Sequence, residues 1–386
     1  MKVTFPHMGN AWIVIQTLFE SLNVEVVVPP INSKRTLNLG AKLSPESACL
    51  PLKLNLGNYV EAADYGADTI VITGGIGPCR FGLYGEVERQ ILREAGYDYD
   101  VVILEPPDGS MLGLFKRIRY LAGRNNSWAQ IIKALRFAYR KSVALDRVED
   151  LIHAARPRLP QPMETEKLYE DAKRRLSQTM TDQGLKETVR WVQESIRERQ
   201  GELQGASDGP REPLRIGIIG EIYTILDPYT SGDVERHLGR LGVEVDRSIY
   251  ISGWTGNHVF QGLAPGYRSI KSYPRHAKPY LPHFVGGHGQ ETVGAAVKFA
   301  KEGFDGIIQI FPLTCMPEIV AASILPKVQE VYKVPIMTLI IDEHTGQAGV
   351  QTRLEAFVDL LERSNLQTFQ RETGKARGDV LTVGGR

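Results

Sequence analysis

Short apolar segments alternate with amphipathic ones in two separate parts of the 386-residue chain, and this alternation is what most limits the possible folds. Strand–helix alternation with β-rich apolar runs is typical of a parallel sheet covered by helices on both faces. In the first part the pattern predicts strands at residues 3–5, 24–29, 68–74 and 99–107. Helices are predicted between them at 10–22, 52–65 and 84–95. We therefore expect a first α/β domain over residues 1–110.

The same alternation returns at LRIGIIG, which begins at Leu214. Further strands are predicted at 248–254, 305–312 and 334–342. Helices are predicted at 234–242, 291–303, 317–332 and 352–364. We expect a second α/β domain over 214–366, followed by a polar tail over 367–386. The predicted fold class is α/β, with two Rossmann-like or flavodoxin-like parallel-sheet domains.

The middle of the chain has a different pattern, with apolar residues at helical spacing and mixed Glu and Lys on the polar faces. It predicts a helical segment over 111–204, inserted between the two domains. The Gly/Pro/Ser-rich run GELQGASDGPREP then predicts a linker over 205–213.

The composition excludes several classes of protein. The net charge of +1 gives no large field that would attract nucleic acid or an acidic membrane surface. The amino terminus reads as a strand and a helix rather than a signal peptide, and no apolar run is long enough for a membrane helix. We expect a cytoplasmic protein.

The three cysteines, Cys49, Cys79 and Cys315, share one kind of context. Their odd number makes a disulfide framework improbable in the cytosol, and buried small apolar residues are the simplest interpretation. However, each lies at a predicted loop–helix junction with a proline nearby, whereas structural cysteines more often lie within an apolar strand or helix face. Ligand sites of α/β sheets gather beyond the carboxyl ends of the strands, and helix N–H groups there lower a thiol pKa.

Three thiols in such positions leave three chemistries open. One is a structural zinc ion, whose fourth ligand would be a histidine from the set His7, His258, His283, His288 and His344. Another is an iron–sulfur cubane with three cysteine ligands and one iron open to water or substrate. A third is a single nucleophilic cysteine, which would not explain the shared context.

The stretch GGIGPCRFGLYGE, residues 74–86, resembles a phosphate loop but lacks the pattern of either common type. We interpret Gly75 and Gly77 as positions where the backbone approaches a bulky bound group closely. Arg80 would balance the charge of a thiolate-bound cluster, and a surface salt bridge is the alternative.

Polar residues near these segments are the candidates for a catalytic or proton-transfer group. His288 lies in a Gly-rich turn ahead of a helix, and Glu343 and His344 lie at a predicted strand end. Glu46 precedes Cys49 by three residues and completes the set of candidates.

Five segments of the chain together resemble a known family, namely SACLPLKLNLGNYVEA, TGGIGPCRFGLYGEV, FPLTCMPEIVAASIL, VGGHGQETVG and DEHTGQAGVQTRLEAFVD. They are similar to the 2-hydroxyacyl-CoA dehydratase component and benzoyl-CoA reductase subunit superfamily. Within it, they most resemble the stand-alone branch called CoA-enzyme activase-like, or "CoA protein activase". The resemblance covers most of the chain, and its most specific part is the three cysteine segments.

The resemblance implies two α/β domains with helical additions and a 4Fe–4S cluster held by Cys49, Cys79 and Cys315, with the fourth iron site open. It also implies a partner, a separate ATP-hydrolysing iron–sulfur activator that donates single low-potential electrons. In the family's characterised dehydratases, this electron makes a ketyl radical from a 2-hydroxyacyl-CoA, which then expels its hydroxyl group.

The chain departs from the dehydratases because they are heterodimers and because no CoA-binding motif is assignable in it. Our leading hypothesis is an oxygen-sensitive iron–sulfur protein that performs a reductive or radical (de)hydration on a CoA thioester or another small molecule. We also consider a homodimer. The alternative is a non-catalytic electron or cluster carrier, or a regulator of a CoA enzyme.

Overall fold

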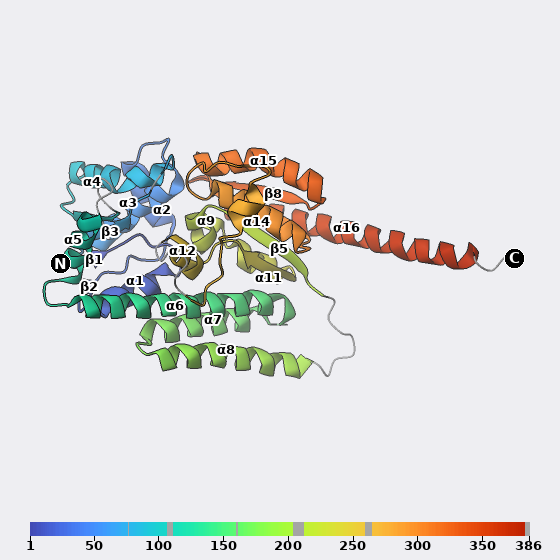
Figure 1. Ribbon diagram of the computed structural model, residues 1–386, viewed down its shortest axis with the longest axis horizontal. Helices are drawn as coiled ribbons and strands as arrows, with labels where there is room; N and C mark the ends of the chain where they lie inside the picture. Colours follow the sequence, from blue (N-terminus) through green and yellow to red (C-terminus); the bar gives the residue numbers. More distant parts are fainter. Residues whose placement is uncertain (76, 106–110, 160, 204–211, 259–264, 383–386) are drawn as a thin grey trace.

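The computed structural model describes residues 1–75, 77–105, 111–159, 161–203, 212–258 and 265–382, with only the backbone at 202–203, 258 and 365–382. These residues contain two four-stranded, all-parallel sheets with the strand orders β2-β1-β3-β4 and β6-β5-β7-β8 (Figure 1). The two orders are equivalent, so each half of the chain repeats one topology. The predicted class of two parallel-sheet α/β domains is therefore confirmed.

The first half follows the predicted alternation closely. Its strands are β1 Lys2–Thr4, β2 Glu25–Val26, β3 Thr69–Thr73 and β4 Asp100–Leu104. Its helices are α1 Ala11–Glu20, α2 Lys34–Leu43, α3 Leu50–Ala63, the short 3₁₀ helix η1 Arg80–Leu83, and α4 Tyr84–Glu94. The predicted strand at 24–29 is shorter than expected, and helix α2 was not predicted. Helix α2 begins with a capping box in which the Ser33 hydroxyl accepts from the backbone of Thr36.

The second half differs from the expectation at one strand. Its strands are β5 Leu214–Gly220, β6 Val243–Arg247, β7 Gly306–Pro312 and β8 Ile336–Ile341. Its helices are α9 Ile222–Leu226, α10 Pro228–Ser231, α11 Val234–Arg240, α12 Ile251–His258, α13 Tyr273–Ala277, α14 Gly289–Lys301, α15 Met316–Tyr332 and α16 Gln347–Thr382.

The strand predicted at 248–254 is wrong, because this segment leads into α12 and the edge strand is β6 instead. Residues Val243 and Val245 are buried and alternate with Glu244 and Asp246, which is the period of a half-buried strand. In the predicted polar tail the backbone is helical through Thr382, since α16 continues to that residue, and its last turns point away from the body (Figure 1).

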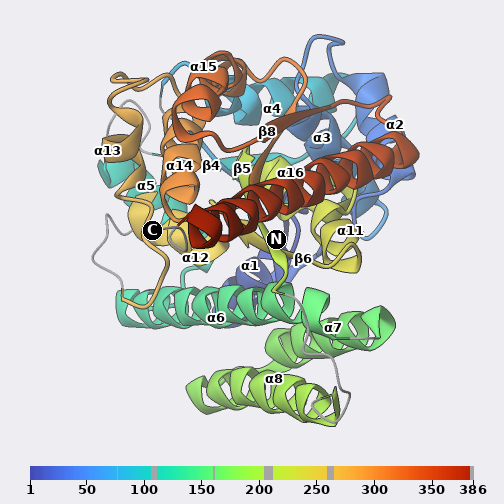
Figure 2. The ribbon, with the colours of Figure 1, turned by 90° about the vertical axis from the view of Figure 1, so that its right-hand side faces the viewer.

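The helical middle of the chain consists of two parts. Helix α5 Met111–Ala122 packs against the first sheet, where Leu121 shares a core cluster with Val71 and Val102. The remaining helices form a separate layer: α6 Trp128–Ala155, the 3₁₀ turn η3 Arg156–Arg158, α7 Pro162–Gln178 and α8 Asp182–Leu203. This layer lies along both halves (Figures 1 and 2).

A single apolar cluster joins the helical layer to both halves. Ile13 of α1 and Leu226 of α9 share it with Leu145, Leu176 and Val192 of the layer. The linker predicted at 205–213 lies mostly outside the described residues. No helix among the described residues is long and apolar enough to cross a membrane.

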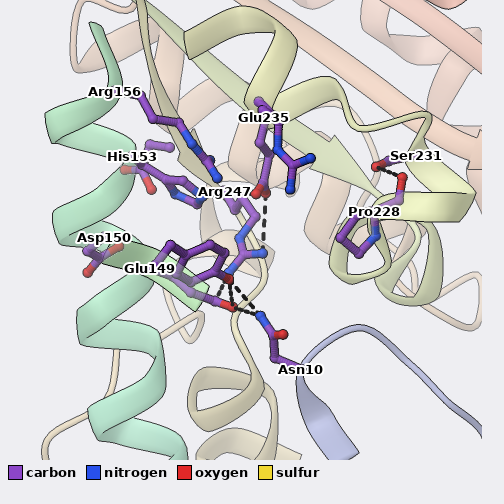
Figure 3. Close-up of polar contacts among 12 residues, drawn as sticks. Asn10, Glu149, Asp150, His153, Arg156, Pro228, Ser231, Glu235 and Arg247 are labelled. Carbon is purple, nitrogen blue, oxygen red and sulfur yellow. Dashed lines mark hydrogen bonds and ion pairs between the residues drawn. The ribbon is translucent and has the colours of Figure 1, made fainter. Parts of the chain in front are cut away.

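A buried ion network attaches the layer to the second sheet (Figure 3). Arg247, at the end of β6, pairs with Glu149 of α6 and, at 3.2 Å, with Glu235 of α11. His153 of α6 contacts Glu235 at 2.9 Å, and Asn10 donates to Glu149 at 2.7 Å. The Arg247 and Glu149 side chains are each only 3% exposed. Because a buried charge needs a partner, these ion pairs fix the position of the helical layer relative to the second sheet.

The carboxyl edges of the two sheets face each other through a cluster of buried hydrogen bonds. The loop after β1 contributes His7, whose carbonyl accepts from Asn32 at 2.7 Å and from the Tyr223 hydroxyl at 3.0 Å. Asp227, which follows α9, accepts from Asn32 at 3.0 Å and from the Gly9 amide at 3.2 Å. The carboxyl edges of the two sheets therefore meet between the halves of the chain, and these edges are where α/β folds bind their ligands.

Candidate functional site

Each of the three cysteines caps the amino-terminal end of a helix. Cys49 is the N-cap residue of α3, Cys79 of η1, and Cys315 of α15. Cys49 and Cys315 have extended backbones, and Pro51 and Pro317 lie in the first turns that follow. A proline is tolerated there because the first N–H groups of a helix have no partner within the helix. The local contexts predicted from the sequence are therefore present.

The fold brings these three cysteines, which are far apart in the chain, to one region. Cys79 follows β3 and Cys315 follows β7, and each strand lies beside the point where the order of its sheet reverses. Cys49 is close enough to the other two for electrostatic interaction, since a charge on Cys79 raises the pKa of Cys49 and a charge on Cys49 raises that of Cys315. The three thiols therefore lie in one region, where charges on them influence one another.

Arg80 connects the three cysteine loops. Its guanidinium donates to the Ser47 carbonyl at 3.0 Å and to the carbonyl and hydroxyl of Thr314, each at 2.9 Å. Ser47 lies two residues before Cys49, and Thr314 directly precedes Cys315. Among the described partners of the Arg80 guanidinium are two main-chain carbonyls and one hydroxyl, which tie its own loop to the Cys49 and Cys315 loops.

Glycines allow the Cys79 loop to pack against the loop before α14. Gly77 has φ +99°, and a Cβ there would lie 2.8 Å from the ring of Phe284. Gly286 has φ +86°, and its Cβ would lie 2.8 Å from the Cys79 backbone nitrogen. At Gly75 the nearest atoms belong to Gly82. The close approach at Gly77 and Gly286 brings the two loops together, whereas Gly75 packs against Gly82 within the Cys79 loop.

Burial raises the pKa of all three thiols. It raises the pKa of Cys49 to about 11, and those of Cys79 and Cys315 also lie above the ordinary value. The carboxylate of Glu221 adds to the increase at each sulfur. The thiols therefore carry their protons at neutral pH, and a metal that binds them must displace those protons.

Two groups favour thiolate at Cys49. The Tyr84 hydroxyl lies 2.5 Å from the Cys49 sulfur, and both this contact and the positive charge of Arg80 lower the thiol pKa. Tyr84 is 4% exposed, at the start of α4. The partner of Cys49 is thus a fixed hydroxyl in a region from which water is largely excluded.

Two carboxyl groups near the thiols were not identified from the sequence. Glu221 follows β5 directly and accepts from the backbone amides of Tyr223 and Thr224 at 3.0 and 2.9 Å. Glu318, in the first turn of α15, is fully buried, and burial raises its pKa to about 7 even though Gln309 and Thr292 donate to it. The sequence signal for Glu221 was its position directly after a predicted strand. The signal for Glu318 was its position in the first turn of the helix that follows Cys315.

Three of the four predicted catalytic candidates lie near Lys53, which donates to the Glu46 carbonyl at 3.2 Å and pairs with Glu343, the residue before His344. Glu343 pairs with Lys53 of α3, and this ion pair holds the Glu343 pKa low despite partial burial. Glu46 and His344 are exposed, and His288 is half-buried at the N-cap of α14. The ion pair between the buried Lys53 and the Glu343 carboxylate links α3 to the loop after β8.

The predicted histidine ligands for zinc lie in different environments. The buried ring of His7 is hydrogen-bonded through Nδ1 to the Pro29 carbonyl at 2.9 Å, and His283 is exposed. The side chain of His258 lies outside the described residues. In the part of the chain that the structure describes, no three His, Cys, Asp or Glu side chains group as ligands of one metal ion. A cubane cluster takes one thiolate on each of several irons rather than several on one ion, so its ligand set is differently spaced.

Comparison with known proteins adds no relatives to this description. No protein-family model matches the chain, and no curated protein matches it significantly.

Proposed function

We propose that Cys49, Cys79 and Cys315 ligate a 4Fe–4S cluster, and that the chain is an iron–sulfur redox protein of the 2-hydroxyacyl-CoA dehydratase type. One observation carries the proposal. Three thiols that are distant in the chain each lie at a helix N-terminus, and Arg80 joins the three loops that carry them. Cysteine thiolates are the usual ligands of such clusters, and three of them leave one iron without a protein thiolate.

The surroundings of the thiols fit an anionic, thiolate-bound group. The Arg80 guanidinium and the Tyr84 hydroxyl both favour the charged form of Cys49. The backbone amides of Phe81 and Glu318, at the starts of η1 and α15, likewise favour the charged forms of Cys79 and Cys315. These residues would offset the thiolate charge and hold the sulfurs.

When bound, the cluster supplies single low-potential electrons for a reductive or radical (de)hydration reaction. Its electrons would come from a separate ATP-dependent iron–sulfur activator, and its substrate would be a CoA thioester or another small molecule. This part of the proposal depends on the resemblance of the cysteine segments rather than on a described substrate pocket.

The decisive experiment is strictly anaerobic purification and reconstitution, followed by iron and sulfide analysis and by EPR spectroscopy after reduction. We expect about four irons and four sulfides per chain and the spectrum of a reduced cubane. A colourless protein that holds no iron after anaerobic reconstitution rules the proposal out. Stoichiometric zinc in place of iron would support the structural zinc alternative.

A second measurement separates an enzyme from a carrier. The reconstituted protein is mixed with a reduced ATP-dependent activator and candidate CoA thioesters, and both product and electron transfer are followed. An enzyme converts a thioester only when activator and ATP are present, whereas a carrier is reduced without converting any substrate and passes its electron to an added acceptor.

A further inference from the structure

The three cysteine loops come from both halves of the chain, so contacts between the loops must fix the positions of the sulfurs relative to one another. Cys49 and Cys79 lie in the first half and Cys315 lies in the second. Apolar packing brings the helices together, since Leu50 and Leu54 of α3 share a core cluster with residues of the second half. That packing positions the helix bodies, and the loops that carry the sulfurs require contacts of their own.

Those contacts converge on Arg80. One arm of its guanidinium holds the Ser47 carbonyl in the Cys49 loop, and the other holds Thr314 in the Cys315 loop. The Thr314 hydroxyl also donates to the Ser47 carbonyl at 3.3 Å, which closes a triangle of three residues. Arg80 itself directly follows Cys79, so each corner of the triangle lies within two residues of a different cysteine.

Thr314 shows that this arrangement is held in place. Its φ of +68° lies in the left-handed region, which a β-branched residue rarely adopts. Such a conformation persists where surrounding contacts determine it. In Thr314 it presents the carbonyl and the hydroxyl to the same guanidinium nitrogen.

We propose that Arg80 is a positioning residue that holds the Cys315 loop against the Cys49 and Cys79 loops and so assembles the three thiols before any metal binds. The importance of Arg80 for iron binding rests on the proposed function. A lysine cannot replace Arg80 fully, because its ammonium lacks the planar fork that reaches two carbonyls on opposite sides.

The test uses metal-free, full-length protein and a short thiol-to-thiol crosslinker, dibromobimane. The variant Cys49→Ser leaves Cys79 and Cys315, one thiol in each half, as the reporting pair. The quantity measured by mass spectrometry is the bridged fraction among chains in which both thiols have reacted. This ratio is independent of how fast each thiol ionises.

We expect Arg80→Gln in this background to lower the bridged fraction at least about threefold, through loss of charge-assisted hydrogen bonds. Arg80→Lys should give an intermediate value. The matched control is Arg89→Gln, which removes an arginine that also donates to a backbone carbonyl, that of Val101, away from the cysteines. Its bridged fraction should equal that of the Cys49→Ser parent.

A bridged fraction in Arg80→Gln equal to the parent's overturns the proposal. If Arg80→Gln does not fold, Arg80→Lys and Thr314→Ala decide, and unchanged bridging in both overturns it as well. Iron binding is measured separately: a wild-type protein that takes up no iron, together with reduced bridging in Arg80→Gln, removes the proposed function and leaves the positioning role supported.

Discussion

The hydroxyl of Tyr84 lies 2.5 Å from the sulfur of Cys49, although the two residues are 35 positions apart in the chain. The contact joins the start of α4 to the start of α3, with Tyr84 buried and Cys49 half-buried. A hydrogen bond to a thiolate stabilises its charged form, so Tyr84 adjusts the acidity of a proposed cluster ligand.

Tyr84→Phe should therefore raise the Cys49 thiol pKa further above its value of about 11. The expected size is about one pH unit, because removing one hydrogen bond from a charged group costs about 1.5 kcal/mol. The measurement is the pH dependence of alkylation in a Cys79→Ser/Cys315→Ser background, where Cys49 is the remaining thiol. Tyr99→Phe serves as the control, since Tyr99 donates to the Tyr59 carbonyl instead. An unchanged or lower midpoint in Tyr84→Phe would contradict the assignment.

Each single change of Cys49, Cys79 or Cys315 to Ser should lower bound iron at least about tenfold after anaerobic reconstitution. Changes to residues that merely orient metal ligands cost about 10–100-fold in affinity, and loss of a ligand should cost no less. Since burial keeps these thiols protonated, iron retention should also fall as the pH is lowered. A variant that retains wild-type iron and an unchanged EPR spectrum shows that its cysteine is not a ligand.

The buried carboxyl of Glu88 should make stability fall as the pH rises. Burial raises its pKa to about 8, although Asn55 and Tyr59 both donate to it. The unfolded chain loses this proton near pH 4, so between about pH 4 and 8 the folded state binds one more proton. This contribution is complete below about pH 4 and is lost as the pH rises to 8, at up to about 1.4 kcal/mol per pH unit.

Glu88→Gln keeps an acceptor for Asn55 and removes the ionisation, so its unfolding free energy should fall less steeply between pH 5 and 8 than that of wild type. Urea titrations across this range measure the difference. Glu86→Gln, on the exposed side of the same helix, is the control and should reproduce the wild-type slope. Parallel curves for Glu88→Gln and wild type would show that Glu88 is ionised in the folded protein.

Arg247→Met should destabilise the protein by about 3–5 kcal/mol, because it leaves the buried carboxylates of Glu149 and Glu235 without their cation. The double variant Arg247→Met/Glu149→Leu should recover part of this loss. Arg140→Gln breaks an exposed pair with Asp182 and should cost less than about 1 kcal/mol. Chemical unfolding measures all three, and equal losses for Arg247→Met and Arg140→Gln would show that the network does not hold the helical layer.

Sequence reasoning succeeded where neighbouring residues decide the structure. The runs at β3 and β7 are mostly apolar, and the prolines after Cys49 and Cys315 mark helix starts. These strands and the caps of α3 and α15 were therefore predictable. It failed at 243–254, where the short strand β6 lies between two helices. The alternating apolar and polar residues of this strand were read as part of the helix before it. Apolar runs as short as 248–254 do not distinguish a strand from the start of a buried helix.

Most contacts of the site could not be predicted from the sequence. Nothing near Arg80 indicates Ser47 or Thr314 as its partners, and nothing near Cys49 indicates Tyr84. Glu221 and Glu318 occupy ordinary strand-end and helix-start positions until the fold brings them to the thiols. The sequence alone determined strands β3 and β7 and the helix starts at Cys49 and Cys315, because those depend on residues a few positions apart. The tertiary structure alone decided which polar groups meet the thiols, because two sheets of the same strand order turn their carboxyl edges toward one another and bring distant loops into contact.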